Sequence, residues 1–441
     1  MMNRLQSSFC FLLALGLLLP ACGGTGDGDP NQPGTELRSE EQRITAPITE
    51  ASDVVAQVAG NTAFALDLYA QVREGSDENL FFSPHSIEVA LAMTWAGARG
   101  DTESDMAGAL HFELDQNAMH PVFNHLDLEL NARGEGAEGA DGEGFRLNVL
   151  NAIWGQVGYT FLDDFLDVLA MHYGAGLWLM DFAANPAAAT EEINEWVEVA
   201  TEDRIEDLIP PGAITGDTRM VLVNAIYFNA AWAEPFEEEN TSDGPFSTLA
   251  GSTVTVPMMH KMSEMAYAVG EGYQAVEIPY DGHELSMLIL VPDLGALDTF
   301  EQGLSPAFLA QVEARRGYGI VDLTMPRWEL DGATFSLKKI LTAMGMGVAF
   351  TAAADFSGMN GTGGLAIQDV LHQAFVKVNE AGTEAAAATG TEAAAATAVI
   401  VGETSAPPMG PTITLDRPFL YLIKDIPTGQ ILFIGRVVDP S

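Results

Sequence analysis

Residues 380–411 read EAGTEAAAATGTEAAAATAVIVGETSAPPMGP, and the interpretation of the whole chain depends on this stretch. It contains few bulky side chains before Val399, yet it lies between segments with strong strand patterns. Alanine favours a helix, and a low-complexity linker would have a similar composition. A long loop inside one domain is uncommon, however, and is usually functional. A third interpretation is that the small side chains allow this loop to enter a β-sheet as an additional strand.

The start of the chain has the pattern of an export signal. Arg4 precedes an apolar run from Phe9 to Leu19, which is too short to span a membrane. The following Leu19-Pro20-Ala21-Cys22 resembles a bacterial lipobox, in which the chain is cut before the cysteine and lipid is attached to it. An ordinary secretory signal cut nearby is the alternative. We expect residues 1–21 to be a signal peptide, and the protein to be lipid-anchored through Cys22 at the outer membrane or cell surface, or secreted.

Residues 22–52 show no apolar period and are rich in Gly, Pro, Asp and Glu, so a flexible tether is expected there. The only other cysteine, Cys10, lies within the expected signal peptide. The mature protein is therefore expected to fold without a disulfide, and to contact a membrane only through a lipid on Cys22.

The remainder of the chain, residues 53–441, has the pattern of one α+β domain. Helical periods run from Asp53 to about Val72 and from Ser86 to Ala98, and three later stretches are also helical, namely Phe161–Tyr173, Ala188–Ala200 and Phe335–Met344. Strand candidates are rich in β-branched and aromatic residues and comprise Phe145–Trp154, Met220–Phe228, Ala275–Ile278, Leu285–Val291, Val321–Met325, Phe419–Ile423 and Ile431–Val438. Helices gather early and strands late, without an internal linker that would divide the domain.

Charge excludes one class of partner. The chain has 19 Lys and Arg residues against 62 Asp and Glu residues, which gives a net charge of −43. A nucleic-acid-binding protein needs clustered basic residues, so no nucleic acid is expected as a partner. The segment from Asp115 to Gly144 is acidic, which also argues against activation by a polyanion.

The sequence contains no recognisable catalytic motif. It has no Gly-x-Ser-x-Gly elbow, no His-Glu-x-x-His pair and no glycine-rich nucleotide loop, so we expect neither an enzyme nor a cofactor. One crowded group of residues could suit a soft metal, although methionine more often fills space in a core: Met258, Met259, His260, Met262 and Met265. We therefore expect no metal site.

Several motifs, in their family order, resemble those of the serpin family of serine protease inhibitors. The resemblance runs from residue 53 to 440 and is carried by Asn79–Ile87, Leu222–Phe228, Ile278–Tyr280, Leu285–Met287, Asn379–Thr389, Asp416–Ile423 and Leu432–Pro440. It implies a serpin fold, with three β-sheets, about eight or nine helices and an exposed reactive-centre loop at about residues 380–411.

The resemblance also implies a function. A serine protease would attack the loop and form an acyl-enzyme, and the cut loop would insert into the central sheet and deform the protease. Such an inhibitor is consumed, acts as a monomer and needs no cofactor. A non-inhibitory serpin, which serves as a protease substrate or as a binding or scaffold protein, is the alternative.

Residue roles follow from the matching positions of the family motifs. The polar shutter beneath the central sheet would consist of Ser83, Ser86, Asn224 and His372. The breach, where the loop begins to enter, would include Trp232 and Arg327. The hinge would comprise Glu380, Gly382, Thr383, Ala385, Ala386, Ala387 and Ala388. We predict an ion pair between Glu380 and Arg327.

The loop departs from the family pattern because the octapeptide Gly-Thr-Glu-Ala-Ala-Ala-Ala-Thr occurs twice, at 382–389 and 390–397. Counting from the second copy places the reactive bond at Thr404–Ser405, whereas counting from the first copy places it at Ala396–Thr397. Small residues at either bond suit an elastase- or subtilisin-like protease. The eight extra residues add roughly 26 Å of extended chain. That slack would leave a protease bound at Thr404 unstrained, and the protein would then behave as a substrate.

Overall fold

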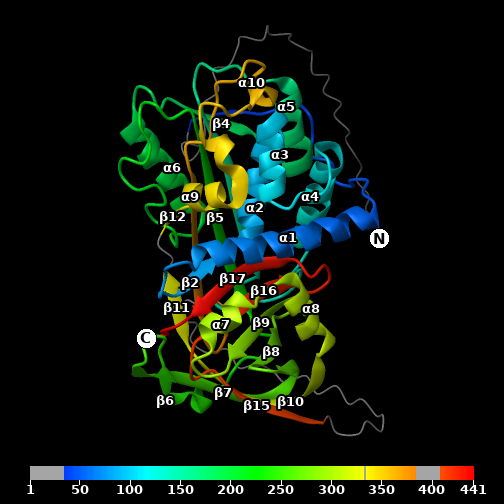
Figure 1. The fold of residues 1–441 in the computed structure, drawn as a ribbon, viewed down its shortest axis with the longest axis vertical. Helices are drawn as coiled ribbons and strands as arrows, with labels where there is room; N and C mark the ends of the chain where they lie inside the picture. The colour runs from blue at the N-terminus through cyan, green and yellow to red at the C-terminus, as the bar shows by residue number, and fades with distance from the viewer. Residues whose placement is uncertain (1–33, 332–333, 384–407) are drawn as a thin grey trace, which may run out of the picture. The chain divides into compact units, whose positions relative to one another are not determined.

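The computed structural model describes residues 34–331, 334–383 and 408–441 (Figure 1). The expected signal peptide, Cys22, the hinge alanines and both candidate reactive bonds lie outside the described residues; these positions are Ala385, Ala386, Ala387, Ala388, Ala396, Thr397, Thr404 and Ser405. Among the described helices, none combines the length and apolar character that crossing a membrane requires.

An eight-stranded sheet carries the site discussed below. Its order is β1-β4-β3-β5-β14-β13-β11, and β12 pairs with β13. The strands are β1 (Thr35–Leu37), β3 (Arg146–Gln156), β4 (Leu177–Met180), β5 (Met220–Ala231), β11 (Trp328–Asp331), β12 (Phe335–Ser336), β13 (Val370–Val378) and β14 (Gly382–Thr383). The central strand β5 is buried along nearly its whole length, and its residues are apolar or aromatic except for Asn224 and Asn229.

The other nine described strands form a second network in the order β15-β10-β7-β8-β9-β16-β17-β2, and β6 pairs with β7. Their bounds are β2 (Leu80–Phe82), β6 (Ser242–Ser247), β7 (Thr253–Gly270), β8 (Tyr273–Pro279), β9 (Leu285–Pro292), β10 (Gly317–Pro326), β15 (Met409–Thr414), β16 (Phe419–Asp425) and β17 (Ile431–Val437). We expected three separate sheets. Two of them are continuous here, because β7 pairs with β10 along Met258–Tyr267 and with β8 along Ala266–Gly270.

Eight of the described α-helices have at least six residues, in agreement with the expected number. They are α1 (Ala51–Val72), α2 (Pro84–Trp95), α3 (Gly100–Ala109), α4 (Gln116–Asn131), α5 (Asp163–Val168), α6 (Pro186–Ala200), α7 (Leu297–Gln302) and α8 (Pro306–Ala314), and the short α9 (Lys338–Leu341) and α10 (Ser357–Asn360) follow. The helix expected at Phe335–Met344 begins only at Lys338, because Phe335 and Ser336 pair with β13. In Figure 1, α1 lies between the helices α2 to α6 and the strands of the nine-stranded network.

Strand β1 corrects the expected extent of the tether. We expected residues 22–52 to be flexible, but Thr35–Leu37 pairs antiparallel with Leu177–Leu179 of β4 and so forms the edge of the eight-stranded sheet. Leu37 also packs against the main apolar core. Residues 35–37 therefore belong to the eight-stranded sheet and not to a tether.

Polar contacts fix the chain between β1 and α1. The backbone N–H of Ile44 donates to Met171 O at 3.0 Å, and Asn124 Nδ2 donates to Ile44 O at 2.7 Å. Arg43 donates through Nε to Asn124 Oδ1 at 3.0 Å and forms an ion pair with Asp127 on α4. These contacts join the segment around Met171 to α4, and the pairing of β1 adds β4 to the same stretch of chain.

Removing this stretch provides a test of its structural role. Deletion of residues 1–44 exposes the backbone edge of β4 and breaks the Arg43 contacts, each worth about 1 kcal/mol. We expect a loss of about 2–3 kcal/mol in the free energy of unfolding, and faster hydrogen exchange at the amides of Leu177–Met180. The control is deletion of residues 1–33, which leaves β1 in place. Equal exchange in the two truncated proteins would show that residues 34–44 do not stabilise the sheet edge.

Candidate functional site

The candidate site lies where the eight-stranded sheet is divided. Strands β5 and β13 run parallel and pair directly only between Leu222–Ile226 and Val370–Ala374. Beyond Ile226 and Ala374, towards the carboxyl ends of the two strands, β14 lies between them and pairs antiparallel with both. The first two residues of the predicted hinge that can enter the sheet, Gly382 and Thr383, are therefore already seated in it.

Steric and polar contacts hold these two residues. A Cβ atom on Gly382 would lie 2.2 Å from the carbonyl oxygen of Ala230 and 2.8 Å from Cα of Ala231, so only glycine fits. Thr383 is fully buried, and its hydroxyl lies 2.7 Å from the Tyr280 hydroxyl. Burial raises the pKa of Tyr280 far above its usual value, so this phenol stays protonated.

The predicted ion pair between Glu380 and Arg327 is present. Arg327 donates to Glu380 Oε1 from Nε at 2.8 Å and from Nη2 at 2.5 Å, and the same oxygen accepts from Thr241 Oγ1. The Glu380 side chain is only 8% exposed, whereas that of Arg327 is 42% exposed. The carboxylate is thus held inside by three donors.

Trp232 closes the site from the side of β5. Its indole Nε1 donates to Asn379 O at 2.9 Å, and its ring stacks on Tyr280 with centroids 4.7 Å apart. Asn379 in turn forms a tight turn, because its Oδ1 accepts from the N–H groups of Ala381 at 3.0 Å and Gly382 at 3.2 Å. The chain therefore reverses from β13 into β14 within four residues.

The four predicted shutter residues come together below this turn. Asn224 on β5 faces His372 on β13 and Asn151 on β3, so three polar side chains form a row across three strands. Asn224 Nδ2 donates to Ser86 Oγ. Ser83 is the N-cap of α2, where its Oγ accepts from Ser86 N at 3.1 Å and donates to Leu432 O at 2.7 Å.

Comparison with known proteins identifies this architecture. Residues 59–440 match the family model described as "Serpin (serine protease inhibitor)". The chain belongs to the serpin family. It is 37% identical over 379 residues to an uncharacterized serpin-like protein of Thermococcus kodakarensis, covering 86% of this chain and 84% of the relative. It is 36% identical to the leukocyte elastase inhibitor of Bos taurus, covering 87% and 99% of the two chains.

Among solved structures, this serpin is similar to thyroxine-binding globulin in complex with thyroxine, with a TM-score of 0.74 and 31% identity, covering 87% of this chain and 99% of the other. Its relatives and structural neighbours therefore include serpins named for protease inhibition and serpins named for ligand binding. Membership of the family establishes the fold and a general association with protease inhibition. Because both inhibitors and a ligand-binding protein share this fold, the activity of this member depends on its site.

Sequence reasoning missed several residues of the site in this serpin. The sequence indicates Tyr280 only as part of an Ile-Pro-Tyr motif and assigns it no role in the site. In the structure, Tyr280 contacts both Trp232 and Thr383. Asn379 immediately precedes the hinge acid, and its position suggests a turn residue. No local sequence motif marks Asn151 or Thr241. Asn151 reaches the site because β3 pairs with β5, and Thr241 reaches it through its hydrogen bond to Glu380, which is distant in the sequence.

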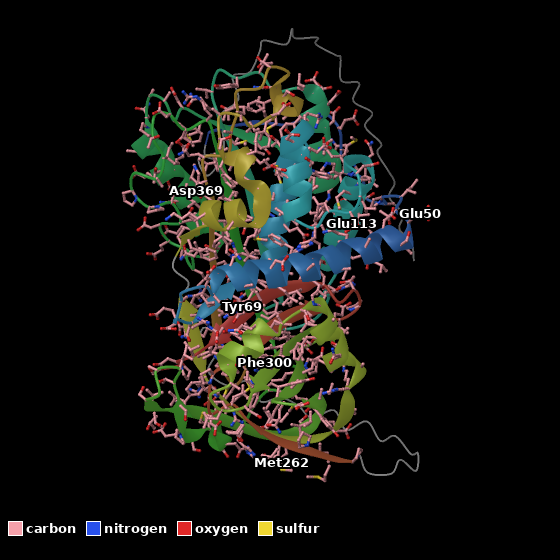
Figure 2. All side chains as sticks on the ribbon, viewed as in Figure 1. Glu50, Tyr69, Glu113, Met262, Phe300 and Asp369 are labelled. Atoms are coloured by element: carbon pink, nitrogen blue, oxygen red, sulfur yellow. The ribbon has the colours of Figure 1, made fainter. Side chains whose placement is uncertain are left out.

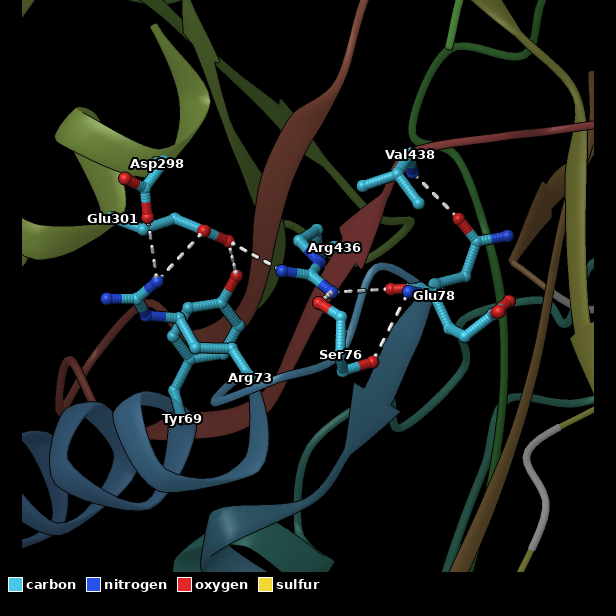
Figure 3. Close-up of polar contacts among 9 residues, drawn as sticks. Tyr69, Arg73, Ser76, Glu78, Asp298, Glu301, Arg436 and Val438 are labelled. Carbon is cyan, nitrogen blue, oxygen red and sulfur yellow. Dashed lines mark hydrogen bonds and ion pairs between the residues drawn. The ribbon is translucent and has the colours of Figure 1, made fainter. Parts of the chain in front are cut away.

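A buried ion-paired cluster holds the last strand of the serpin to its body (Figure 3). Arg436 on β17 is 2% exposed and donates to Glu301 Oε1 at 3.2 Å, to Ser76 O at 2.9 Å and to Glu78 O at 2.6 Å. Burial and the adjacent Glu301 carboxylate raise the pKa of Tyr69, whose hydroxyl donates to Glu301. Strand β17 also pairs with β16 and β2. The cluster and this strand pairing together hold the segment that follows the loop to the rest of the protein.

The methionine-rich segment is structural where it is buried. Met258, Met259 and Met265 belong to the core, while His260 Nε2 lies 2.8 Å from Asp322 Oδ1. Within residues 34–331, 334–383 and 408–441, no three His, Cys, Asp or Glu side chains form a group that could hold a metal ion.

His372 gives the shutter a defined protonation state. Its Nε2 accepts from Ser83 N at 3.1 Å, so the ring proton is on Nδ1 and donates to Asn224 Oδ1. Complete burial lowers the pKa of His372 to about 3. Both contacts therefore depend on the neutral ring, and protonation would replace the Nε2 acceptor with a second donor.

The pKa of His372 predicts an acid-dependent loss of stability. The folded pKa of about 3 lies below the ordinary 6.5, so the unfolded chain binds one more proton between these pH values. Stability should therefore fall as pH decreases through this range. For His372→Asn, we expect the slope of the unfolding free energy against pH between 4 and 6 to be smaller by about 1.4 kcal/mol per pH unit. Urea titrations at several pH values measure this slope, and parallel profiles for wild type and variant would contradict the assignment.

Proposed function

We propose that this serpin inhibits a serine protease by suicide trapping. The observation that supports the proposal most strongly is β14, because the chain has already begun to enter the sheet between β5 and β13. The protease serine would attack the carbonyl carbon of the reactive bond, the amine of the following residue would leave with a proton, and an ester would join protease and loop. Insertion of the freed loop would then carry the protease along the sheet.

The register of β14 predicts how many residues of the loop could pair with β5. Gly382 pairs with Ala231 and Thr383 with Ala230, so the residue numbers of each antiparallel pair add to 613. The first residue of β5, Met220, would accordingly face residue 393 after full insertion. Insertion would also replace the direct parallel pairing of β5 and β13 by two antiparallel ladders, which are slightly more stable per residue.

This register favours Ala396–Thr397 as the bond whose cleavage leads to trapping. A cut after Ala396 leaves three residues beyond position 393, or about 10 Å of extended chain. A cut after Thr404 leaves eleven residues, or about 36 Å, which is enough slack to release the protease from strain. We therefore propose that cleavage at Ala396 traps the protease and that cleavage at Thr404–Ser405 turns the serpin into a substrate.

The side chains of the loop agree with an elastase- or subtilisin-like partner. Ala396 and Thr404 are both small, and a shallow specificity pocket accepts such residues. Related serpins carry the name leukocyte elastase inhibitor, which supports the same class of protease. We further propose that the protein has no catalytic activity of its own, acts as a monomer, and is held at a cell surface by a lipid on Cys22 or is secreted.

The alternative is a non-inhibitory serpin. The likeness to thyroxine-binding globulin shows that the same fold serves a ligand-binding protein. The second octapeptide favours this alternative, because it lengthens the loop that must carry the protease. The seated hinge and its small residues favour the inhibitor.

The two candidates differ in the products they give with an elastase-type protease. A trapping serpin forms a complex that resists SDS, and its ester maps to Ala396. A non-inhibitory serpin gives only cleaved chain and fully active protease. Gel electrophoresis, residual protease activity and mass spectrometry of the fragments distinguish these outcomes, and absence of the complex with elastase-, subtilisin- and chymotrypsin-type proteases would refute the proposal.

Deletion of residues 390–397 tests the role of the duplicated octapeptide. The deletion brings Thr404 to the distance from the hinge that Ala396 has in the wild type. We expect the number of serpin molecules consumed per protease inhibited to fall towards one, because cleavage after Thr404 then leaves no slack. Replacing residues 390–394 by Gly and Ser residues retains both the length and the Ala396–Thr397 bond, and is the matched control. An unchanged stoichiometry in the deletion variant would show that loop length does not determine the outcome.

A further inference from the structure

A cavity of about 250 Å³ lies where strand β7 separates from β8. The two strands pair along Ala266–Gly270, whereas β7 pairs with β10 along Met258–Tyr267, so β7 leaves β8 before Ala266. Figure 2 labels Met262, which marks this part of β7 at the lower edge of the view. We call the opening the fork cavity, and the residues that line it include Glu234, Lys261, Ser263, Glu264, Glu277 and Ser286.

Lys261 places its amine beside the fork cavity in a fixed position. Its Nζ donates to Glu234 O at 2.6 Å and lies 4.5 Å from the centre of the Phe236 ring. Phe236 is itself buried, and its backbone N–H donates to Glu380 O at 2.9 Å. A nucleophile that is held in one place beside a binding cavity reacts faster than one that moves freely.

The same surroundings favour the uncharged form of this amine. Burial lowers the pKa of Lys261 to about 8, and the Glu234 carboxylate only partly opposes this effect. Near pH 7.5 about a quarter of the Lys261 amines are therefore uncharged, compared with about 0.1% for a lysine of ordinary pKa. Only the uncharged amine has a lone pair that can attack carbon. Lys261 is thus a nucleophile at neutral pH.

The charges around the fork cavity favour a neutral ligand. Arg316 forms an ion pair with the buried Glu277 at 2.7 Å, so its charge is already compensated. Ser286 Oγ donates to the same carboxylate at 2.7 Å. The exposed Glu234 and Glu264 carboxylates add further negative charge, which disfavours an anionic ligand.

The size and lining of the fork cavity indicate a small hydroxylated ligand. Its volume of about 250 Å³ is below the roughly 300–1,000 Å³ of sites for drug-sized molecules. Hydroxyl groups can donate to carboxylates and exchange hydrogen bonds with serine. A short aldehyde with hydroxyl groups on the adjacent carbons meets these requirements. The lining combines polar with apolar side chains, namely Ser263, Glu264, His283, Met265 and Ile426.

We propose that the fork cavity binds short-chain hydroxyaldehydes and that Lys261 joins them in a Schiff base. The uncharged Nζ attacks the carbonyl carbon and forms a carbinolamine. The former carbonyl oxygen then leaves as water with the two protons that the amine loses, and a C=N bond remains. The step needs no oxidant, reductant or further reactant. The site is separate from the shutter, and the inference does not depend on the proposed function.

Glyceraldehyde with sodium cyanoborohydride provides the test, because reduction converts each Schiff base into a stable secondary amine. Lys338 is the internal control, since its Nζ also donates to a backbone carbonyl, Gln368 O at 2.9 Å, and lies 5.8 Å from the centre of the Phe350 ring. The protein is treated near neutral pH. Mass spectrometry of its peptides then measures the rate of adduct formation at each lysine of the chain, namely Lys261, Lys338, Lys339, Lys377 and Lys424.

We expect Lys261 to react about tenfold faster than Lys338 or more, because its amine is both uncharged and held beside the bound aldehyde. The rate at Lys261 should saturate as the glyceraldehyde concentration rises, and it should level off above about pH 8. The rate at Lys338 should rise linearly with concentration. Equal rates at the two lysines would overturn the proposal, as would a fast reaction at Lys261 that does not saturate.

Ser263→Leu tests the cavity itself, because leucine fills part of it and leaves the Lys261 amine in place. The matched control is Met262→Leu, since Met262 is 55% exposed and alternation along β7 points it to the other side of the strand. We expect Ser263→Leu to slow the reaction at Lys261 about fivefold or more and Met262→Leu to leave it unchanged. Thermal unfolding establishes that both variants are folded.

An unchanged rate in folded Ser263→Leu would contradict the assignment of the fork cavity. If this variant does not fold, saturation of the reaction at Lys261 in the wild type still decides the question. No protease takes part in either measurement, so the result is independent of whether the serpin traps one.

Discussion

The direct pairing of β5 with β13 is the constraint on which the structure depends. These two central strands are parallel, and only Leu222–Ile226 and Val370–Ala374 join them. Parallel ladders are slightly weaker than antiparallel ones, and a strand between β5 and β13 would be antiparallel to both. The sheet is therefore closed here by a parallel pairing, and Gly382 and Thr383 already lie between the two strands.

Polar residues hold the two strands together at this seam. Neutral His372 and Asn224 link the two strands in the middle, and the buried Glu380 carboxylate ties the hinge to Arg327 and Thr241 at the end. Buried polar groups require a more exact geometry than apolar side chains do, because each loses its hydrogen bonds if the geometry shifts. These polar contacts therefore hold the two strands in one defined arrangement. The Arg436 cluster holds the last strand to the body.

Much of this arrangement could be predicted from the sequence, because short motifs carry the local geometry. The hinge motif placed Glu380 opposite Arg327, and the Asn-Leu-Phe-Phe-Ser-Pro-His-Ser motif placed Ser83 and Ser86 in the shutter, where they contact His372 and Asn224. Contacts between distant segments were not predictable in this way. Strand β1 depends on an edge offered by β4 and on side chains of α4, neither of which leaves a pattern in residues 34–44. Strand β7 could not be predicted from its sequence, because Pro257 interrupts the alternation of polar and apolar residues. Its methionines instead suggested core filling or a metal site.

Thermal unfolding of the cleaved serpin tests the seam most directly. The protein is nicked once in the loop by a catalytic amount of protease, the nick is mapped by mass spectrometry, and the melting of intact and nicked samples is compared. Insertion between β5 and β13 predicts that the nicked protein, with both fragments still bound, melts at a much higher temperature than the intact chain. Nicked protein that melts at the same temperature as the intact chain, with residues 384–396 still open to a second protease, would contradict it.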